Sequence, residues 1–263
     1  MIVDKNFDFG FAPWRLSGTV YGALLNHRPQ LAALGDAVNA APYKAAPAFP
    51  VLQVRPRNTF SGHDAVVALP ADPGCVDVGV SLGIVISRTA CRVTQAEALS
   101  FVAAYLTVAE LGLPQDQHYR PAVRFKARDG FTVLGTVVAA EQVPDPDALL
   151  THTQVNGIET FQGDTGDRVR GVAALLSAVT EFMTLQAGDV LLLGASAAAP
   201  QARAGDVVEV AVQGVGALRF SLTQEAPSLS YASLLLSKSD PPPTPALTAS
   251  GRVVYAGAIH TAV

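Results

Sequence analysis

The sequence predicts an α+β protein that is mainly β, with a few helices on the outside of a strand-rich core. Two observations support this fold class. Short apolar segments with strand-like alternation recur along the chain, and only a few segments show helical spacing. The 263 residues, 49% of them apolar, are enough to fill a hydrophobic core.

The clearest strand is Val76–Arg88, in which branched apolar residues alternate with small or polar ones. This period of two is typical of a half-buried strand, so one face should pack in the core. The other face contains Gly79 and Ser81 and has little side-chain volume. We therefore expect that another segment approaches this face closely or that a cavity lies over it.

The segments before this strand are expected to form, in order, a strand, a helix, a loop and a strand. Pro29 and its polar neighbours stop the first strand, and the loop contains three prolines, which favour an extended conformation. The four segments are Ser17–Leu25, Leu31–Val38, Ala40–Pro50 and Val51–Val54.

Two helices are expected after the strand. Thr94 and Glu97 have the spacing of a capping box, which should open the first helix. The apolar residues that would share one face of this helix are Leu99, Val102, Tyr105 and Leu106. The second helix is Asp167–Leu185, which has an apolar stripe at helical spacing and is ended by Gly188. Between them, Tyr119–Gly130 carries four cations around a possible short strand.

The remaining segments favour strands. An Asn156-Gly157 dipeptide separates two of them and suits the type I′ turn of a hairpin. The predicted strands are Thr132–Val138, Leu150–Val155, Ile158–Phe161, Val190–Leu193, Val207–Val212 and Ala217–Leu222.

The C-terminal part differs in composition. Ser237–Pro245 predicts a stiff polar linker, and Ser250–Ile259 is similar to the first strand. Either a second copy of that strand begins there, or two small apolar strands are alike by chance. We therefore divide the chain into an N-terminal region at 1–50, a core domain at 51–225 and a linker with tail at 226–263.

Composition excludes several classes of function. A net charge of −4 with only 18 basic residues provides no field for nucleic acid. Cys75 and Cys91 fit no metal-binding spacing and are expected to be reduced thiols, as in the cytoplasm. The N-terminus lacks a signal-peptide pattern, and the longest apolar stretch, Val190–Pro200, is about half of a membrane helix. We expect a soluble cytoplasmic protein without nucleic-acid or membrane partners.

Several motifs, in order along roughly Gly18–Leu222, resemble the fumarylacetoacetate hydrolase family. They are Arg55–Thr59, Ser81–Ser87, Tyr119–Gly130, Glu181–Asp189, Gly205-Asp206 and Gly214–Gly216. Asn26–Arg28 followed by Pro42–Lys44 is typical of the N-terminal half of the family's two-half isomerase/decarboxylases of 4-hydroxyphenylacetate (homoprotocatechuate) catabolism. In those enzymes the C-terminal half carries the metal, and the linker with the restarted strand here resembles the junction between the halves.

The resemblance implies a rolled mixed β-structure with an open cleft. It also implies Mg²⁺ or a similar cation, which chelates a 2-oxo acid and stabilises an enolate. The family's metal ligands, Glu-x-Glu and a later acid, fall on Gly79, Ser81 and Glu110. Because one carboxylate is too little to hold Mg²⁺ against its hydration shell, we predict no metal or other cofactor for this chain. Mg²⁺ or Mn²⁺ would be required only if the chain is an autonomous enzyme.

The family's catalytic His and Glu fall on Gln30 and Ala33, neither of which takes a proton at pH 7. The family's Thr-Pro after a glycine becomes Ala195-Ser196 after Gly194, and its late Asn becomes Phe220. Lys126, which in the family lies near the substrate, is retained. The resemblance therefore leaves Lys126, Arg124 and Gly194 as candidate substrate-binding residues, and Glu110 and Lys126 as weak catalytic candidates.

Each candidate has a simpler interpretation. The cations around Lys126 are also consistent with a solvated or interface surface. Glu110, which follows the first predicted helix, is also consistent with a hydrogen-bonded remnant of the site. His63 beside Asp64 is better explained as an exposed loop residue than as a general base. His27 could pair across a subunit boundary.

Three classes of function follow. The first, which we favour, is an N-terminal-type subunit that pairs with a metal-bearing paralogue of the same fold; a homodimer is the alternative assembly. The second is an autonomous metal-dependent decarboxylase, isomerase or C–C hydrolase acting on 2-oxo dicarboxylates. The third is a non-catalytic module that binds a small dicarboxylate.

Overall fold

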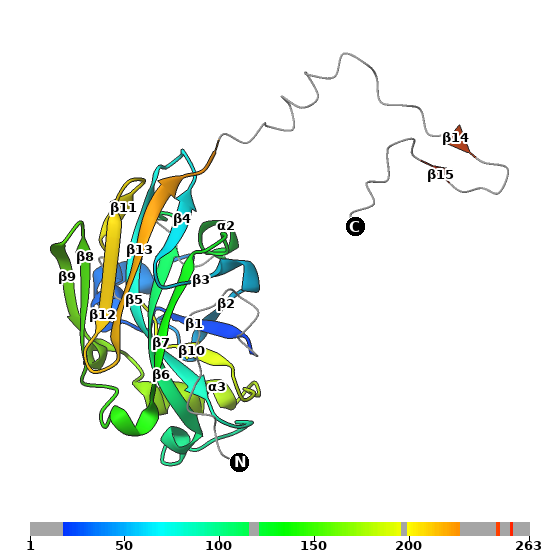
Figure 1. Cartoon of the computed structure of the whole chain (residues 1–263). Coiled ribbons are helices and arrows are strands. Elements are labelled where there is room, and N and C mark those ends of the chain that lie inside the picture. Colours follow the sequence, from blue (N-terminus) through cyan, green and yellow to red (C-terminus); the bar gives the residue numbers. More distant parts are fainter. Residues whose placement is uncertain (1–17, 116–120, 196–198, 227–245, 248–252, 255–263) are drawn as a thin grey trace. The chain divides into compact units, whose positions relative to one another are not determined.

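The computed structural model describes residues 18–115, 121–195 and 199–226, together with 246–247 and 253–254. The chain divides into two units, Met1–Glu225 and Ala226–Val263, which are described separately. The first unit contains two β-sheets with short helices at their edges (Figure 1), so the predicted mainly β fold class is confirmed.

The larger sheet has eight strands in the order β2-β1-β10-β5-β6-β7-β3, and β11 pairs with an end of β5. Its strands are β1 (Val20–Leu24), β2 (Val51–Arg55), β3 (Phe60–Gly62), β5 (Cys75–Ile86), β6 (Val102–Gly112), β7 (Thr132–Ala139), β10 (Val190–Leu192) and β11 (Gln201–Arg203). The sheet is mixed, because β1 runs parallel to β10 and β3 parallel to β7 while the other pairs are antiparallel. Strand β1 lies in the predicted region 1–50 and the remaining strands in 51–225.

The smaller sheet has five strands in the order β4-β13-β12-β8-β9. They are β4 (Ala65–Leu69), β8 (Leu150–Val155), β9 (Ile158–Asp164), β12 (Val207–Val212) and β13 (Gly216–Gln224). The predicted hairpin between β8 and β9 is confirmed: Asn156 and Gly157 both have positive φ, 53° and 76°, as a type I′ turn requires.

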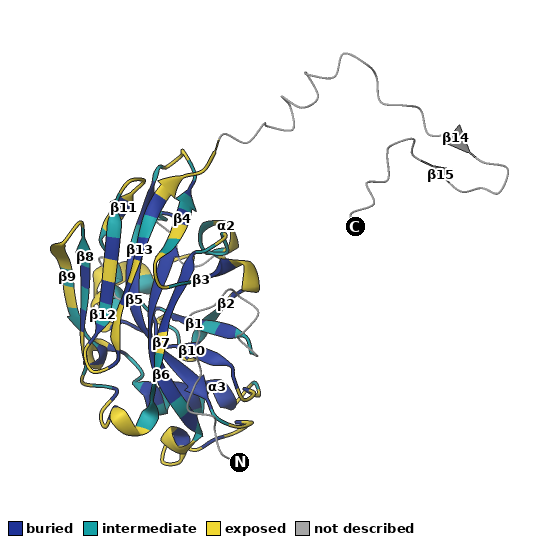
Figure 2. Ribbon diagram, in the orientation of Figure 1, coloured by how far each residue is buried: buried dark blue, intermediate teal, exposed yellow. Residues whose placement is uncertain are grey.

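The core lies where the two sheets face each other. The apolar face of β5 belongs to one buried cluster with residues of β12 and β13, and β5 and β6 are buried along almost their whole length (Figure 2). Members of this cluster are Val76, Val78, Val80, Leu82, Val208, Val210, Leu218 and Phe220. The predicted packing of this face of Val76–Arg88 is therefore confirmed.

The α-helices are short, namely α1 (Arg28–Leu34), α2 (Val123–Lys126) and α3 (Val172–Thr180). Short 3₁₀ segments occur at Gly35–Asn39, Arg57–Thr59, Ala98–Phe101, Ala140–Gln142 and Thr165–Asp167. The predicted helix Leu31–Val38 is thus displaced toward the N-terminus and continues as 3₁₀ turns.

The helix predicted after Thr94 is wrong. The Thr94 hydroxyl does bond the Glu97 carboxylate at 2.8 Å, but only the turn Ala98–Phe101 follows, and Val102–Gly112 is strand β6. Strand β6 lies between β5 and β7 and is buried on both faces, so its apolar residues form an unbroken run rather than an alternation.

Two other predictions need correction. The possible short strand within Tyr119–Gly130 is the helical turn α2. The helix predicted at Asp167–Leu185 spans only Val172–Thr180, and the Val172 backbone N–H donates to the Asp147 carboxylate at 2.8 Å. This bond satisfies one of the free N–H groups in the first turn and supports a start there. Strands β3, β4 and β11 were not predicted.

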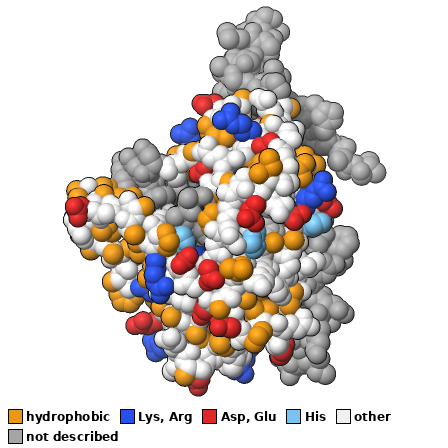
Figure 3. All heavy atoms as spheres, turned by 90° about the vertical axis from the view of Figure 1, so that its left-hand side faces the viewer, with side chains coloured by type: hydrophobic (Ala, Val, Ile, Leu, Met, Phe, Trp, Pro, Cys, Tyr) orange, Lys and Arg blue, Asp and Glu red, His pale blue; other side chains and the backbone are white. Residues whose placement is uncertain are grey.

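In the second unit, β14 (Ala246–Leu247) pairs antiparallel with β15 (Val253–Val254). The predicted linker Ser237–Pro245 lies outside the described residues, as does most of Ser250–Ile259. No helix in the described parts of the chain has the length and apolar character to cross a membrane. On the face drawn in Figure 3, basic side chains are interspersed with acidic and apolar ones.

Candidate functional site

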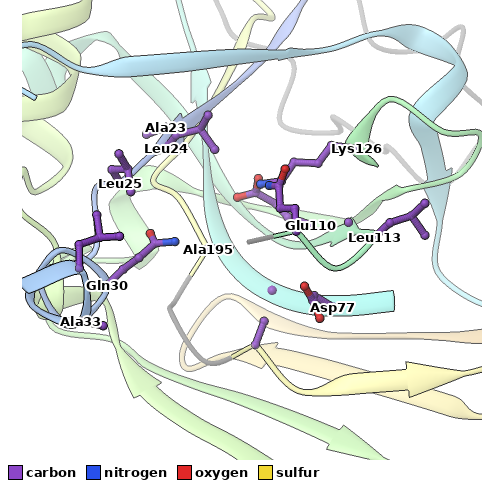
Figure 4. A pocket seen from close by; sticks show the side chains of 15 residues that line it. Ala23, Leu24, Leu25, Gln30, Ala33, Asp77, Glu110, Leu113, Lys126 and Ala195 are labelled. Carbon is purple, nitrogen blue, oxygen red and sulfur yellow. The ribbon is translucent and has the colours of Figure 1, made fainter. Parts of the chain in front are cut away.

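A cavity of about 370 Å³ lies over the small-residue face of β5, on the side of the sheet opposite the core. Its wall is formed by β5, β6, α1, α2 and the segment after β10 (Figure 4). The lining residues with polar side chains are Gln30, Asp77, Glu110, Gln115 and Lys126. The remaining lining residues are glycine, alanine and leucine.

The pairing of β5 with β6 brings the polar groups of the cavity together. Gly79 lies opposite Glu110, and Asp77 lies opposite Gly112. Because alternate residues of a strand share a face, these four residues form one patch of the cavity floor. Sequence reasoning expected either a cavity or a close neighbour over Gly79, and both are present: Gly79 lines the cavity, and a Cβ built on it would collide with the Ala195 methyl.

Ser81, two residues further along β5, does not line the cavity. Its side chain is buried, and its hydroxyl accepts a hydrogen bond from the Gly194 backbone N–H at 3.1 Å. Gly194 has a φ of 102°, and a Cβ there would lie 2.7 Å from the Ala23 carbonyl oxygen. Ser81 and Gly194 therefore hold the segment after β10 against the sheet.

Glu110 is a buried carboxylate whose charge is already paired. Its Oε2 accepts hydrogen bonds from Arg55 Nη2 and from Gln53 Nε2, both at 3.1 Å. Its Oε1 has no hydrogen-bond partner among the described residues. Arg55 is itself buried and also donates to the carbonyls of Leu111 and Lys126, at 3.1 and 3.0 Å. Glu110 thus lies on a strand, not after a helix, and within a fixed ion pair.

Lys126 reaches the cavity from the last residue of α2. Its alkyl chain lies over Gly112, where an added Cβ would be 3.3 Å from the lysine Cγ. Burial and the nearby Arg55 lower the pKa of Lys126 to about 8, although Glu110 and Asp77 oppose this shift. Burial raises the pKa of Asp77, against the opposing effects of a 3.1 Å hydrogen bond from Gln201 and of the Lys126 charge.

The other residues singled out from the sequence have different surroundings. Gln30 and Ala33 line the cavity from α1, whereas Arg124 is exposed and does not line it. Phe220 is buried in the core, and Ser196 lies outside the described residues. Lys126 and Glu110 are therefore brought into one cavity, and Arg124 is not.

His63 and His27, the two histidines considered from the sequence, do not line the cavity. His63 is exposed, 3.4 Å from Asp64, and accepts a hydrogen bond from the Arg219 backbone N–H. His27 is buried within this chain, where burial and Arg168 lower its pKa to about 4 despite the opposing charge of Asp167. The sequence analysis did not identify Arg55, Gln53 or Asp77 as residues of the site. For Arg55, the available signal was that an arginine ends the apolar strand β2.

The comparisons with known proteins agree with this geometry. The model of the family described as fumarylacetoacetate (FAA) hydrolase C-terminal matches residues 19–223. The chain belongs to the fumarylacetoacetate hydrolase family. This confirms the family that the motifs indicated.

Curated relatives and solved structures give the same assignment. The chain is 35% identical over 210 residues to the 4-hydroxyphenylacetate degradation bifunctional isomerase/decarboxylase of Escherichia coli, covering 80% of this chain and 48% of that protein. It is 32% identical to 2,4-didehydro-3-deoxy-L-rhamnonate hydrolase of a Sphingomonas strain, covering 68% of this chain and 66% of that protein. The structure of 5-carboxymethyl-2-hydroxymuconate delta-isomerase from Mycobacterium smegmatis superposes with a TM-score of 0.68, 26% identity and 81% coverage of both chains.

The chain thus spans about half the length of the bifunctional relatives it matches. Within that span, this fumarylacetoacetate hydrolase family chain retains the fold and a cavity on the β5–β6 face.

The side chains at the family's metal-ligand positions do not fit a hard dication. Mg²⁺ requires a near-octahedral set of oxygens and is usually held through carboxylates. Here Glu110 is paired with Arg55, the Ser81 hydroxyl is bonded to the backbone, and the Ala195 methyl occupies the space over Gly79. No group of three or more His, Cys, Asp or Glu residues suited to a metal ion occurs in the described part of the chain.

Proposed function

We propose that this chain is an N-terminal-type subunit of aromatic catabolism whose metal site is degenerate. It would act with a metal-bearing paralogue as 2-hydroxyhepta-2,4-diene-1,7-dioate isomerase / 5-carboxymethyl-2-oxohex-3-ene-1,7-dioate decarboxylase. The proposal is supported by 35% identity to a bifunctional relative of which the chain covers 48%. In such a two-part enzyme, the half that the chain matches would act together with the other half.

The observation that carries the proposal is the Arg55–Glu110 ion pair. The one carboxylate at a ligand position is neutralised by a guanidinium that is buried within the protein. A dication placed beside Glu110 would have to displace this guanidinium or tolerate its charge at close range. By itself, the chain is therefore poorly suited to hold a metal ion that acts as a Lewis acid.

A second feature supports the proposal independently. Gln30 and Ala33 line the cavity at the positions where the family has a proton-transferring His and Glu. An amide and a methyl group are not proton acceptors at pH 7. Both the charge stabilisation and the proton transfer of the family reaction would therefore come from the partner subunit.

Metal analysis of the purified chain tests the degenerate site. After dialysis against Mn²⁺ and removal of free metal, we expect far less than one ion per chain. A metal-bearing paralogue treated in parallel should retain about one and is the matched control. Near-stoichiometric Mn²⁺ on this chain would contradict the proposal and favour an autonomous decarboxylase, isomerase or C–C hydrolase.

Co-expression tests the partnership. The chain and a metal-bearing paralogue from the same genome, each with a different affinity tag, should co-purify and give a mixed oligomer by native mass spectrometry. Isomerase and decarboxylase activities should be present in the mixed species and absent from this chain alone. Separate elution at micromolar concentration, including a homodimer that excludes the paralogue, would refute the subunit role.

The presence of Lys126 in the cavity favours one alternative, a non-catalytic module that binds a dicarboxylate. A dicarboxylate such as oxaloacetate should then stabilise the isolated chain by RT ln(1 + [L]/Kd), so the melting temperature should rise with the logarithm of ligand concentration above Kd, and Lys126→Met should abolish the shift. The subunit role does not require the isolated chain to bind a dicarboxylate, so it predicts no such shift in melting temperature.

A further inference from the structure

The amine of Lys126 is held in the cavity by a specific local arrangement. Because Gly112 lacks a Cβ, the lysine's alkyl chain can lie flat on strand β6. The side chain extends from α2 toward Glu110, and Asp77 lies on the neighbouring strand opposite Gly112 (Figure 4). The amine therefore enters a region bordered by two carboxylates and by the cavity.

This amine is not engaged in a close ion pair. None of the salt bridges between described residues includes Lys126, and the buried carboxylate of Glu110 is bound by Arg55. Arg55 also donates to the backbone carbonyl of Lys126, which fixes α2 and places a permanent positive charge near the amine. The lysine is thus positioned by this contact, and its charged form is disfavoured first by burial and then by Arg55, against the opposing charges of Glu110 and Asp77.

We propose that Lys126 forms a reversible imine with the ketone carbon of a small 2-oxo acid bound in this cavity. This chemistry is distinct from the proposed subunit role, because it needs neither a metal ion nor a partner. It concerns the isolated chain and can succeed or fail independently of that role.

The neutral amine that this reaction needs is available near neutral pH. With a pKa of about 8, roughly a tenth of Lys126 is unprotonated at pH 7, whereas an ordinary lysine is almost entirely charged. Lowered lysine pKa values of this kind are how proteins activate amines for attack on carbonyl groups.

The imine reaction balances with solvent as the proton source. The Nζ lone pair attacks the ketone carbon, the carbonyl π electrons move to oxygen, and a proton passes from nitrogen to that oxygen, giving a carbinolamine. A hydronium ion from solvent protonates the hydroxyl, which leaves as water as the nitrogen lone pair forms the C=N bond. The products are an iminium cation and water, and hydrolysis reverses each step.

The cavity fits a 2-oxo acid better than a larger or doubly charged carbonyl compound. The positive charge of the iminium forms on the carbon next to the substrate carboxylate and offsets the negative charge of that carboxylate. Apolar walls from Leu25, Leu34 and Leu113 suit a short carbon chain, and Gln30 points into the cavity from the opposite side (Figure 4). The volume of about 370 Å³ suits a small acid.

Reductive trapping tests the proposal. The full chain is incubated with pyruvate and cyanoborohydride, which reduces an imine to a stable amine, and the adduct is mapped by peptide mass spectrometry. The chain has four lysines, Lys5, Lys44, Lys126 and Lys238, so the assignment is direct. We expect labelling of Lys126 at least about tenfold faster than of exposed Lys44, with a rate that rises with pH up to about 8.

Several controls make the outcome decisive. Lys126→Met should abolish that adduct, whereas the matched variant Lys44→Met should not. Asp77→Asn removes a charge that raises the pKa of Lys126, so the pH midpoint of trapping should fall below about 8. Lactate, which lacks the ketone, should give no adduct. Equal labelling of Lys126 and Lys44, or equal trapping of acetone and pyruvate, would overturn the proposal. A circular dichroism spectrum unchanged by each substitution confirms that the variants fold.

Discussion

Replacing Arg55 with methionine should destabilise this protein severely. Arg55 is 1% exposed, and its guanidinium bonds the Glu110 carboxylate and the carbonyls of Leu111 and Lys126. Methionine fills part of the volume but leaves the Glu110 charge buried beside a single neutral donor, Gln53. Breaking a buried ion pair by removing one partner costs about 3–5 kcal/mol. This is a large fraction of the roughly 5–15 kcal/mol that stabilises a typical domain.

The measurement is urea unfolding at pH 7, followed by far-UV circular dichroism. Arg219→Met is the matched control, because it makes the same substitution at an exposed position on strand β13 and should change the unfolding free energy by less than about 0.5 kcal/mol. A double-mutant cycle with Glu110→Gln separates the ion pair from packing. Since the double variant buries no unpaired charge, its loss should be about 2 kcal/mol smaller than the sum of the single losses. Additive losses, or a loss below about 1 kcal/mol for Arg55→Met, would refute the reasoning that the Arg55–Glu110 ion pair stabilises the fold.

Three further predictions concern charge and space around the site. The pKa of Lys126 falls from 10.5 to about 8 on folding, so the unfolded chain binds more protons between these two pH values. Stability should therefore rise with pH in this range, and Lys126→Met should flatten the rise in urea midpoints measured across it. The pKa of His27 falls from 6.5 to about 4, so stability should decrease as pH falls through this window, and His27→Gln should remove that part of the acid sensitivity. Gly79→Ala should lower the unfolding free energy by about 1–3 kcal/mol in urea, because the added Cβ meets the Ala195 methyl. Adding Ala195→Gly should restore at least half of this loss. A Gly79→Ala variant of unchanged stability would show that the segment after β10 moves aside at little cost.

Strands with an alternating apolar pattern could be predicted from the sequence. The strand that is buried on both faces was not predicted. Val76–Arg88 shows a period of two because only one face packs in the core. Val102, Tyr105 and Leu106 were assigned to a helix because a strand buried on both faces has no period to distinguish it from a buried helix. Thr94 and Glu97 do bond each other, so the local motif was identified correctly while the element that follows was not.

The composition of the site was predictable only in part. The placement of Glu110 and Lys126 in one cavity followed from the family resemblance and is what the structure describes. The pairing of Glu110 with Arg55 joins residues 55 positions apart, on strands that are not neighbours in the sheet. No local pattern encodes such a contact, because it depends on how the strands of the larger sheet are ordered in space. The charge state of the site therefore could not be obtained from the sequence.

This contact explains why an acid persists at a ligand position although its neighbours are glycine and serine. Arg55 needs a buried anion, since a guanidinium without one would be costly at this depth. Glu110 supplies that anion, and Arg55 in turn holds the backbone of Lys126 and disfavours the charge on its amine. Glu110 is therefore better understood as support for the arginine and the lysine than as a remnant of metal binding. If so, Glu110→Gln, which removes a charge that raises the pKa of Lys126, should move the pH midpoint of pyruvate trapping below about 8 without changing the metal content of the chain.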